Sequence, residues 1–210
     1  MKSLFRLALA AALSVATLSA QAALDARPGG MVYDTVQNIT WLADWNYAKT
    51  SGFDADGLMN WSTADAWANN LVYGGFSDWR QPTALNANGT GPCFGFNCTG
   101  SEMGHMFYNN WGATAGNAFS TGSNAANLAL FTNVQSNMYW SGTEPAPFPG
   151  SAWDFFANGG SQNFAGKLSE LYAVAVRPGD VAAIPEPQTY ALLLAGLGAV
   201  VVAVRRRRPR

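Results

Sequence analysis

The chain has 210 residues and a formal net charge of −1, but its two ends hide a more acidic middle. Between residues 23 and 184, five basic side chains stand against twelve acidic ones, a net charge of −7. This balance argues against nucleic acid and against direct binding to anionic lipid or polysaccharide, although cation-bridged contacts stay compatible with it. Low charge with many Trp, Gly, Asn and Ser residues is unlike a typical cytosolic enzyme.

The first 22 residues have the organisation of a secretory signal peptide. Lys2 and Arg6 precede an apolar stretch at residues 7–18, and Ala-Gln-Ala at residues 20–22 supplies small residues around a cleavage position. We expect cleavage after residue 22. The segment 23–184 is then exported, and its size suits one domain.

Two strands and a helix are predicted in the first half of this exported segment. The strands are residues 31–34 and 39–42, which are short apolar runs joined by a turn. Ser62 is the expected N-cap of the helix, with Asp65 in a capping-box position. The glycine pair at residues 74–75 is expected to end the helix.

A second helix and several strands are predicted in the second half. The helix covers residues 102–111 with Ser101 as its N-cap, and a loop with a helical turn near residues 128–131 follows. The strands are expected at residues 76–80, 138–141, 152–156, 161–164 and 171–177. These elements predict a single α+β domain with two short helices and a small twisted antiparallel sheet.

The two cysteines, Cys93 and Cys98, are expected to form a structural disulfide, because the exported compartment is oxidising. A zinc site needs more ligands than two thiols, and the single histidine is His105. The spacing also differs from the two-residue spacing of thiol oxidoreductases.

Most of the eight tryptophans are expected in the core, because the exported segment is poor in Leu and Ile. The core prediction names Trp61, Trp67, Trp79 and Trp140. Asp78 and Arg80 flank Trp79 on alternate residues, so they share a face opposite the indole. We expect these two, together with Arg177, to form structural ion pairs.

Sugar binding is predicted where aromatic and polar residues adjoin. The ring faces of Trp and Tyr stack on sugar CH groups, while neighbouring Asn and Asp bind hydroxyls. The candidate ligand residues are Trp45 and Tyr47 in one loop and Trp153 with Asp154 further on. Surface glycans or extracellular polysaccharide are the expected ligands.

Calcium is a weaker candidate at Asp54 and Asp56, which alternate before Gly57 as at the start of a calcium loop. The third oxygen ligand and the distal Glu of such a loop are missing, so a solvated turn is the alternative. No other cofactor is predicted.

Catalysis is not predicted. His105 is the single histidine base, Glu102 lies one helical turn before it, and no Gly-x-Ser-x-Gly nucleophile motif is present. Paired carboxylates for glycoside hydrolysis could come from Asp154 with Glu144 or Glu102. A secreted hydrolase of matrix polysaccharide is therefore the alternative to a non-catalytic protein.

The segment 185–210 combines three elements in a fixed order. Pro185, Glu186 and Pro187 form an extended tripeptide, and an uncharged apolar run at residues 190–204 precedes the arginines at 205–208. A helix over this run would span roughly 22 Å, short of a full hydrocarbon core of about 30 Å, with the arginines on the cytoplasmic side.

This arrangement resembles the PEP-CTERM sorting signal of Gram-negative bacteria. The family's partner is an exosortase-type membrane protease or transpeptidase. The resemblance implies a transient inner-membrane anchor through a transmembrane helix, followed by processing and a final location at the cell surface or in the extracellular matrix.

The segment 31–180 carries a second resemblance, through short motifs that occur in order. They are Trp-Ser at 61–62, Gly-Gly-Phe-Ser-Asp-Trp-Arg at 74–80, Tyr-Trp-Ser-Gly-Thr-Glu at 139–144, Ala-Trp at 152–153 and Tyr-Ala-Val-Ala-Val-Arg-Pro at 172–178. They resemble the Lcl C-terminal domain family of bacterial envelope proteins.

That family looks distantly like the C-type-lectin fold, which implies a C-type-lectin-like domain acting in binding, adhesion or structure. The family usually continues Asp-Trp-Arg into Leu-Pro and a helix with an acidic residue. Here residues 81–89 are rich in Asn and Gly, and the cysteine loop follows.

Overall fold

The computed structural model describes residues 24–181. The predicted signal peptide, the Pro185–Pro187 tripeptide, the apolar run and the terminal arginines lie outside these residues. Among the helices of the described part, none is long and apolar enough to cross a membrane.

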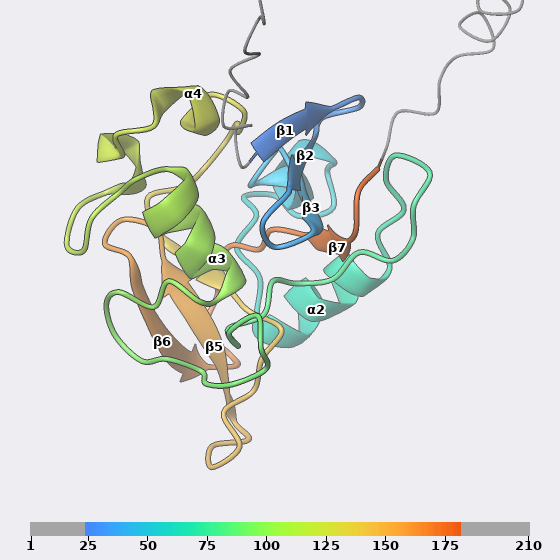
Figure 1. The fold of residues 1–210 in the computed structure, drawn as a ribbon. Coiled ribbons are helices and arrows are strands. Elements are labelled where there is room, and N and C mark those ends of the chain that lie inside the picture. Colours follow the sequence, from blue (N-terminus) through green and yellow to red (C-terminus); the bar gives the residue numbers. More distant parts are fainter. Residues whose placement is uncertain (1–23, 182–210) are drawn as a thin grey trace, which may run out of the picture.

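The described chain is α+β, with two small antiparallel sheets where the sequence predicts one (Figure 1). The first sheet has the order β1-β2-β3-β7, and the second has the order β4-β5-β6. The strands are β1 Leu24–Arg27, β2 Met31–Asp34, β3 Ile39–Leu42, β4 Met138–Trp140, β5 Ser151–Phe156, β6 Ser161–Gly166 and β7 Val176–Pro178.

The segment 171–178 explains why there are two sheets. Leu171 and Tyr172 make single bridges to Met59 and Tyr139, whereas Val176 lies opposite Trp41 in β3. One segment thus connects β4 with β3 and cannot be the continuous strand expected over residues 171–177. Only β7, at its end, is a strand.

The first two predicted strands are confirmed as β2 and β3, with Asp34 opposite Ile39. Strand β1 was not predicted, because Asp25 and Arg27 hide its apolar pattern. Arg27 donates to both carboxylate oxygens of Asp180 at 2.7 and 2.9 Å, which ties the start of the domain to its end.

Helix α2 covers Trp61–Asn69, and its N-cap is Asn60 rather than Ser62. The Asn60 side chain accepts a hydrogen bond from the Thr63 amide at 3.0 Å, and Ser62 donates to Asn60 instead. The helix ends before the glycine pair at 74–75, which belongs to a tight turn with positive φ angles.

The second predicted helix is confirmed, with a change of winding. Helix α3 covers Glu102–His105 and continues into a π-helical turn over Met106–Asn110. Ser101 accepts a hydrogen bond from the Gly104 amide at 3.2 Å, as expected of the N-cap. Figure 1 shows α3 beside β5 and β6.

Three further helical segments are short. They are α1 at Tyr47–Thr50, a 3₁₀ turn at Phe119–Thr121 and α4 at Ala125–Leu128. The helical turn expected near residues 128–131 therefore lies three residues earlier. Residues 76–80 form no strand, because only single bridges form there, from Phe76 to Tyr73 and from Arg80 to Val176.

The core is rich in aromatic residues, as predicted. Trp67, Trp79 and Trp140 are buried with 4%, 2% and 0% exposure. Trp61 is only partly buried: its Nε1 donates to the Ser141 carbonyl at 2.8 Å, and the Lys167 ammonium lies 4.3 Å from the ring centroid.

Candidate functional site

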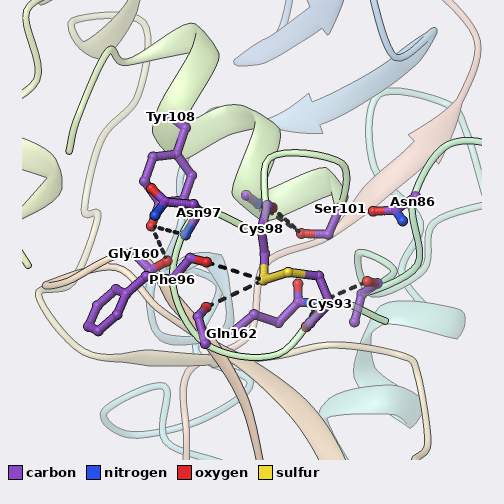
Figure 2. The surroundings of a disulfide bond; sticks show 12 residues. Asn86, Cys93, Phe96, Asn97, Cys98, Ser101, Tyr108, Gly160 and Gln162 are labelled. Carbon is purple, nitrogen blue, oxygen red and sulfur yellow. Dashed lines mark hydrogen bonds between the residues drawn. A yellow bond between two sulfur atoms is a disulfide. The ribbon is translucent and has the colours of Figure 1, made fainter. Parts of the chain in front are cut away.

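The predicted disulfide is present between Cys93 and Cys98, whose Cα atoms are 5.5 Å apart. Figure 2 shows it beside the start of α3 and the Gln162 side chain of β6. Cys98 is almost fully buried, at 1% exposure. The bond therefore closes a small loop whose end at Cys98 is packed inside the domain.

Hydrogen bonds fix this loop to β6. Gly95 and Gln162 exchange two backbone hydrogen bonds of 2.7 and 2.8 Å. The side-chain Nε2 atom of Gln162 also donates to the Cys93 carbonyl at 2.7 Å. The Tyr108 hydroxyl accepts from the Asn97 amide and donates to the Gly160 carbonyl (Figure 2). The loop is therefore held at its middle and at its end.

An exposed aromatic patch lies where this loop meets the second sheet. We use that name for Phe94, Phe148 and Phe164, which are 65%, 52% and 37% exposed, with the indole of Trp153 beneath them. The Phe94 ring lies 5.9 Å from Phe164 and 6.2 Å from Trp153, and Phe148 stacks on Phe164 at 5.4 Å. Four rings from three separate segments thus form one cluster.

The sequence pointed to only one member of this patch, Trp153, which is 7% exposed and supports the phenylalanines. Phe94 sits in the cysteine loop, Phe148 in the turn before β5 and Phe164 in β6. The sequence did contain one signal for Phe94, which follows Cys93 directly. A short loop closed by a disulfide has little room to bury its side chains, so an aromatic residue inside it is a candidate for the surface.

The predicted aromatic platform at residues 45–47 is wrong for Trp45. Its indole is 1% exposed and is surrounded by rings, including Trp111 at 4.8 Å and Tyr139 at 5.2 Å. Tyr47 is partly buried, with its ring 4.9 Å from Tyr73. A ligand therefore cannot stack on Trp45 in this fold.

Asp154 also departs from its predicted role at a ligand surface. Its side chain is buried at 1% exposure, and its Oδ1 atom has no hydrogen-bond partner within residues 24–181. Burial raises the pKa of Asp154 to about 6. The carboxyl group thus lies inside the domain and does not border the patch as an open acceptor.

Two more of the groups considered for catalysis, Glu102 and His105, lie in structural surroundings. Arg80 donates to both carboxylate oxygens of Glu102, at 2.8 and 2.6 Å, and the Thr83 amide donates to the same carboxylate at 2.7 Å. Burial lowers the pKa of His105, against an opposing effect of the Asp34 carboxylate 4.0 Å away.

The expected structural ion pairs are present, but Asp78 and Arg80, which were expected on one face, do not pair with each other. Arg177 donates to both oxygens of Asp78 at 2.8 and 3.0 Å, while Arg80 binds Glu102. The hydrogen bonds from Arg177 lower the pKa of Asp78. Both pairs fasten the segment after α2 to other parts of the chain.

The calcium candidates Asp54 and Asp56 accept hydrogen bonds from their own loop. The Asp54 carboxylate receives the Asp56 and Gly57 amides at 3.0 and 2.7 Å, and Asp56 receives the Leu58 amide at 3.0 Å. Within the described range, no three His, Cys, Asp or Glu side chains gather as a metal site would require. Calcium binding here stays a prediction.

Two family models match the sequence. The Lcl C-terminal domain matches residues 30–177, and the PEP-CTERM protein-sorting motif matches residues 183–208. No curated protein and no solved structure matches the chain. The first match covers most of the described domain, from the turn before β2 to β7, and the second covers most of the segment that follows the domain.

Proposed function

Because the chain belongs to the Lcl C-terminal domain family, we propose that it is a non-catalytic module that binds extracellular polysaccharide through its aromatic patch. The PEP-CTERM motif makes it an exported protein that an exosortase, a membrane enzyme, sorts to the cell surface. The proposal concerns what the surface domain does there.

The aromatic patch is the observation that carries this proposal. Isolated exposed apolar residues are common, but a cluster of exposed rings in contact with one another marks an interaction surface. Aromatic faces suit the CH faces of pyranose rings. The loop between Cys93 and Cys98 carries no charge, so the patch favours an uncharged stretch of polysaccharide over an anionic one.

Two contacts and one buried side chain support a non-catalytic role over the hydrolase alternative. Glu102 is held by Arg80, Glu144 accepts from the Lys167 ammonium at 2.7 Å, and Asp154 is buried. None of these carboxyl groups is free beside the patch, whereas a glycosidase needs two of them facing one glycosidic bond.

We also propose that the domain is a divergent C-type-lectin-like fold. Strands β1 and β7, from the two ends of the domain, lie in one sheet. Helices α2 and α3 lie in the chain between the strands of the two sheets. An experimental structure should superpose these elements on C-type-lectin domains; a different strand order would reject the relationship.

Matrix retention tests the binding proposal. Phe94→Ser and Phe148→Ser should weaken retention of the exported protein by polysaccharide from the native matrix, since each removes an exposed ring. Phe53→Ser is the matched control, because Phe53 is 55% exposed but is not part of the patch. Equal retention of all three variants and the parent would reject the patch as the binding surface.

Sorting is tested separately at the terminal motif. Replacing Glu186 by Ala, or deleting residues 185–187, should leave export intact and trap an unprocessed membrane form. Intact-mass measurement of the released protein decides the outcome. Normal release with the normal C-terminal mass would show that processing does not depend on this tripeptide.

A further inference from the structure

A polar cleft of about 390 Å³ lies apart from the residues of the aromatic patch. It is formed by α1 with its N-cap, the loop that carries Asp54 and Asp56, residues 133–135 and the segment before β7. Its lining residues are Asn46, Lys49, Thr50, Asp56, Asn133, Gln135 and Tyr172. Small-molecule sites have volumes of about 300–1,000 Å³, so the cleft could hold one small ligand.

Lys49 distinguishes this cleft from the rest of the surface. Within residues 24–181, four of the five basic side chains have a carboxylate oxygen within 4.0 Å, and Lys49 has none. The domain carries an excess of acidic groups, so this ammonium group had many candidate partners. Lys49 is instead exposed and lines the cleft.

The amide side chains of the cleft are held in place by their own hydrogen bonds. Asn133, in the left-handed region at φ 54°, donates to Asp44 at 3.0 Å. The Gln135 side chain donates to the Asn133 carbonyl at 2.8 Å, and the Gln135 backbone amide donates to the Tyr139 hydroxyl at 2.6 Å. Since Nε2 of Gln135 is used, its Oε1 oxygen is left as an acceptor for a ligand.

Asn46 adds a buried polar group to the same wall. Its residue is 5% exposed, its amide nitrogen donates to the Asp56 carbonyl at 3.2 Å, and its Oδ1 atom has no partner within the described chain. The cleft therefore combines an unpaired ammonium group, carboxylate and amide oxygens, and the tyrosine ring of residue 172.

We propose that this cleft binds one neutral hexopyranose unit of a saccharide. A hydroxyl group both donates and accepts, so one sugar can receive a hydrogen bond from Lys49 and donate others to Asp56 and Gln135. The CH face of the ring would lie on Tyr172. The nearby carboxylates of Asp44 and Asp56 oppose an anionic ligand, and Lys49 opposes a bare cation.

This inference rests on the proposed saccharide-binding function and adds a second, chemically different contact. The patch offers ring faces alone and suits repeated stacking along a chain. The cleft offers directed hydrogen bonds and suits recognition of one sugar unit. A polysaccharide that contacted both surfaces would be held more tightly than by either one.

Saturation-transfer NMR of the exported protein with D-glucose, D-galactose and D-mannose, each beside D-glucuronate, tests the cleft. We expect at least one neutral hexose to bind and D-glucuronate to bind more weakly. Lys49→Met and Gln135→Ala should each weaken hexose binding by about tenfold, because each removes a ligand hydrogen bond. Lys167→Met, which removes a cation outside the cleft, should bind like the parent.

Phe94→Ser separates the two proposals. Hexose binding that survives Phe94→Ser and falls in Lys49→Met supports the cleft, even if the patch fails to retain polysaccharide. Binding lost in Phe94→Ser and unchanged in Lys49→Met would overturn the cleft while keeping the patch. Absence of hexose binding, or tighter binding of glucuronate than of every hexose, would also overturn the cleft.

Discussion

Two aromatic clusters of this domain use the same residue types in opposite ways. Around Trp45, the rings of Trp41, Trp111, Phe131 and Tyr139 lie within 6 Å and are all buried. In the aromatic patch the spacing between rings is similar, but three of the four rings are exposed. Contact between rings therefore does not distinguish a core from a binding surface.

The difference lies in what covers each cluster. Trp45 lies three residues after the end of β3. Its partners come from β3, the residue after the π-helical turn, the segment after α4 and strand β4, so they close around it. The patch has β5, β6 and the disulfide loop beneath it and no described segment above it. An aromatic ring therefore contributes mainly to stability in the cluster around Trp45, whereas in the aromatic patch its face is free to bind a ligand.

The largest expected effect is that of Trp45→Ala. Removing a large buried aromatic side chain costs about 3–5 kcal/mol, because the surrounding rings cannot close the cavity. Chemical denaturation of the exported protein measures the loss, with Phe53→Ala as an exposed control. A cost under about 1 kcal/mol would place Trp45 at the surface, as the sequence suggested.

Asp154 sharpens the comparison from inside β5, next to the patch residue Trp153. Burial raises its pKa to about 6, so the protonated form is favoured more strongly in the folded state than in the unfolded state. Its contribution to stability is present below about pH 4 and is lost as the pH rises through 6. Asp154→Asn should therefore be more stable than the parent by roughly 2–3 kcal/mol at pH 7.5.

Thermal unfolding of both proteins at pH 4 and at pH 7.5 checks this prediction. The two should melt close together at pH 4, where the parent carboxyl is protonated. A constant difference across this range would mean that Asp154 does not titrate in the folded protein as its burial requires. Since Asp78 and Asp180, whose pKa values are lowered, are common to both proteins, they cancel in the comparison.

The disulfide should have a smaller effect on stability and a clear effect on the patch. Closing a loop of about six residues stabilises a fold by about 2 kcal/mol through loop entropy. Replacing Cys93 and Cys98 together by Ser should cost about that amount and should also weaken matrix retention, since Phe94 loses its fixed position. Intact mass before and after alkylation must first show that no free thiol is present.

The smallest change in stability is expected for Phe94→Ser. The ring is 65% exposed, so its removal should change the free energy of unfolding by less than about 1 kcal/mol. The same variant should be retained less well by polysaccharide from the native matrix, so its effect on retention exceeds its effect on stability, the reverse of Trp45→Ala. Destabilisation as large as that of a core tryptophan would show that the patch is a structural cluster.

Local sequence signals predicted those parts of the fold that depend on neighbours in the chain. The short apolar runs of β2 and β3 and the Ser101 cap of α3 are confirmed. The disulfide is confirmed as well, because each of these features involves residues close in sequence. The Asn60 cap shows the limit of such signals. Asn60 and Ser62 are both good caps, and only the direction in which the chain enters α2 decided between them.

The candidate site was less predictable, because its parts are distant in sequence. Phe94, Phe148 and Phe164 meet only after β5 and β6 pair and the cysteine loop docks on Gln162. The cleft likewise joins Lys49 to Gln135 and Tyr172. A single sequence gives the residue types but not which of them share a surface.

By itself, the sequence determined the family, the terminal sorting motif, the α+β class and the aromatic character of the core. These depend on composition, on the order of motifs and on short-range periodicity. The tertiary structure alone decided that Trp45 is core and Phe94 is surface and that Arg80 pairs with Glu102. It also decided that Lys49 has no carboxylate partner within residues 24–181. Burial and ion pairing depend on which distant segments pack together, and local patterns do not specify that.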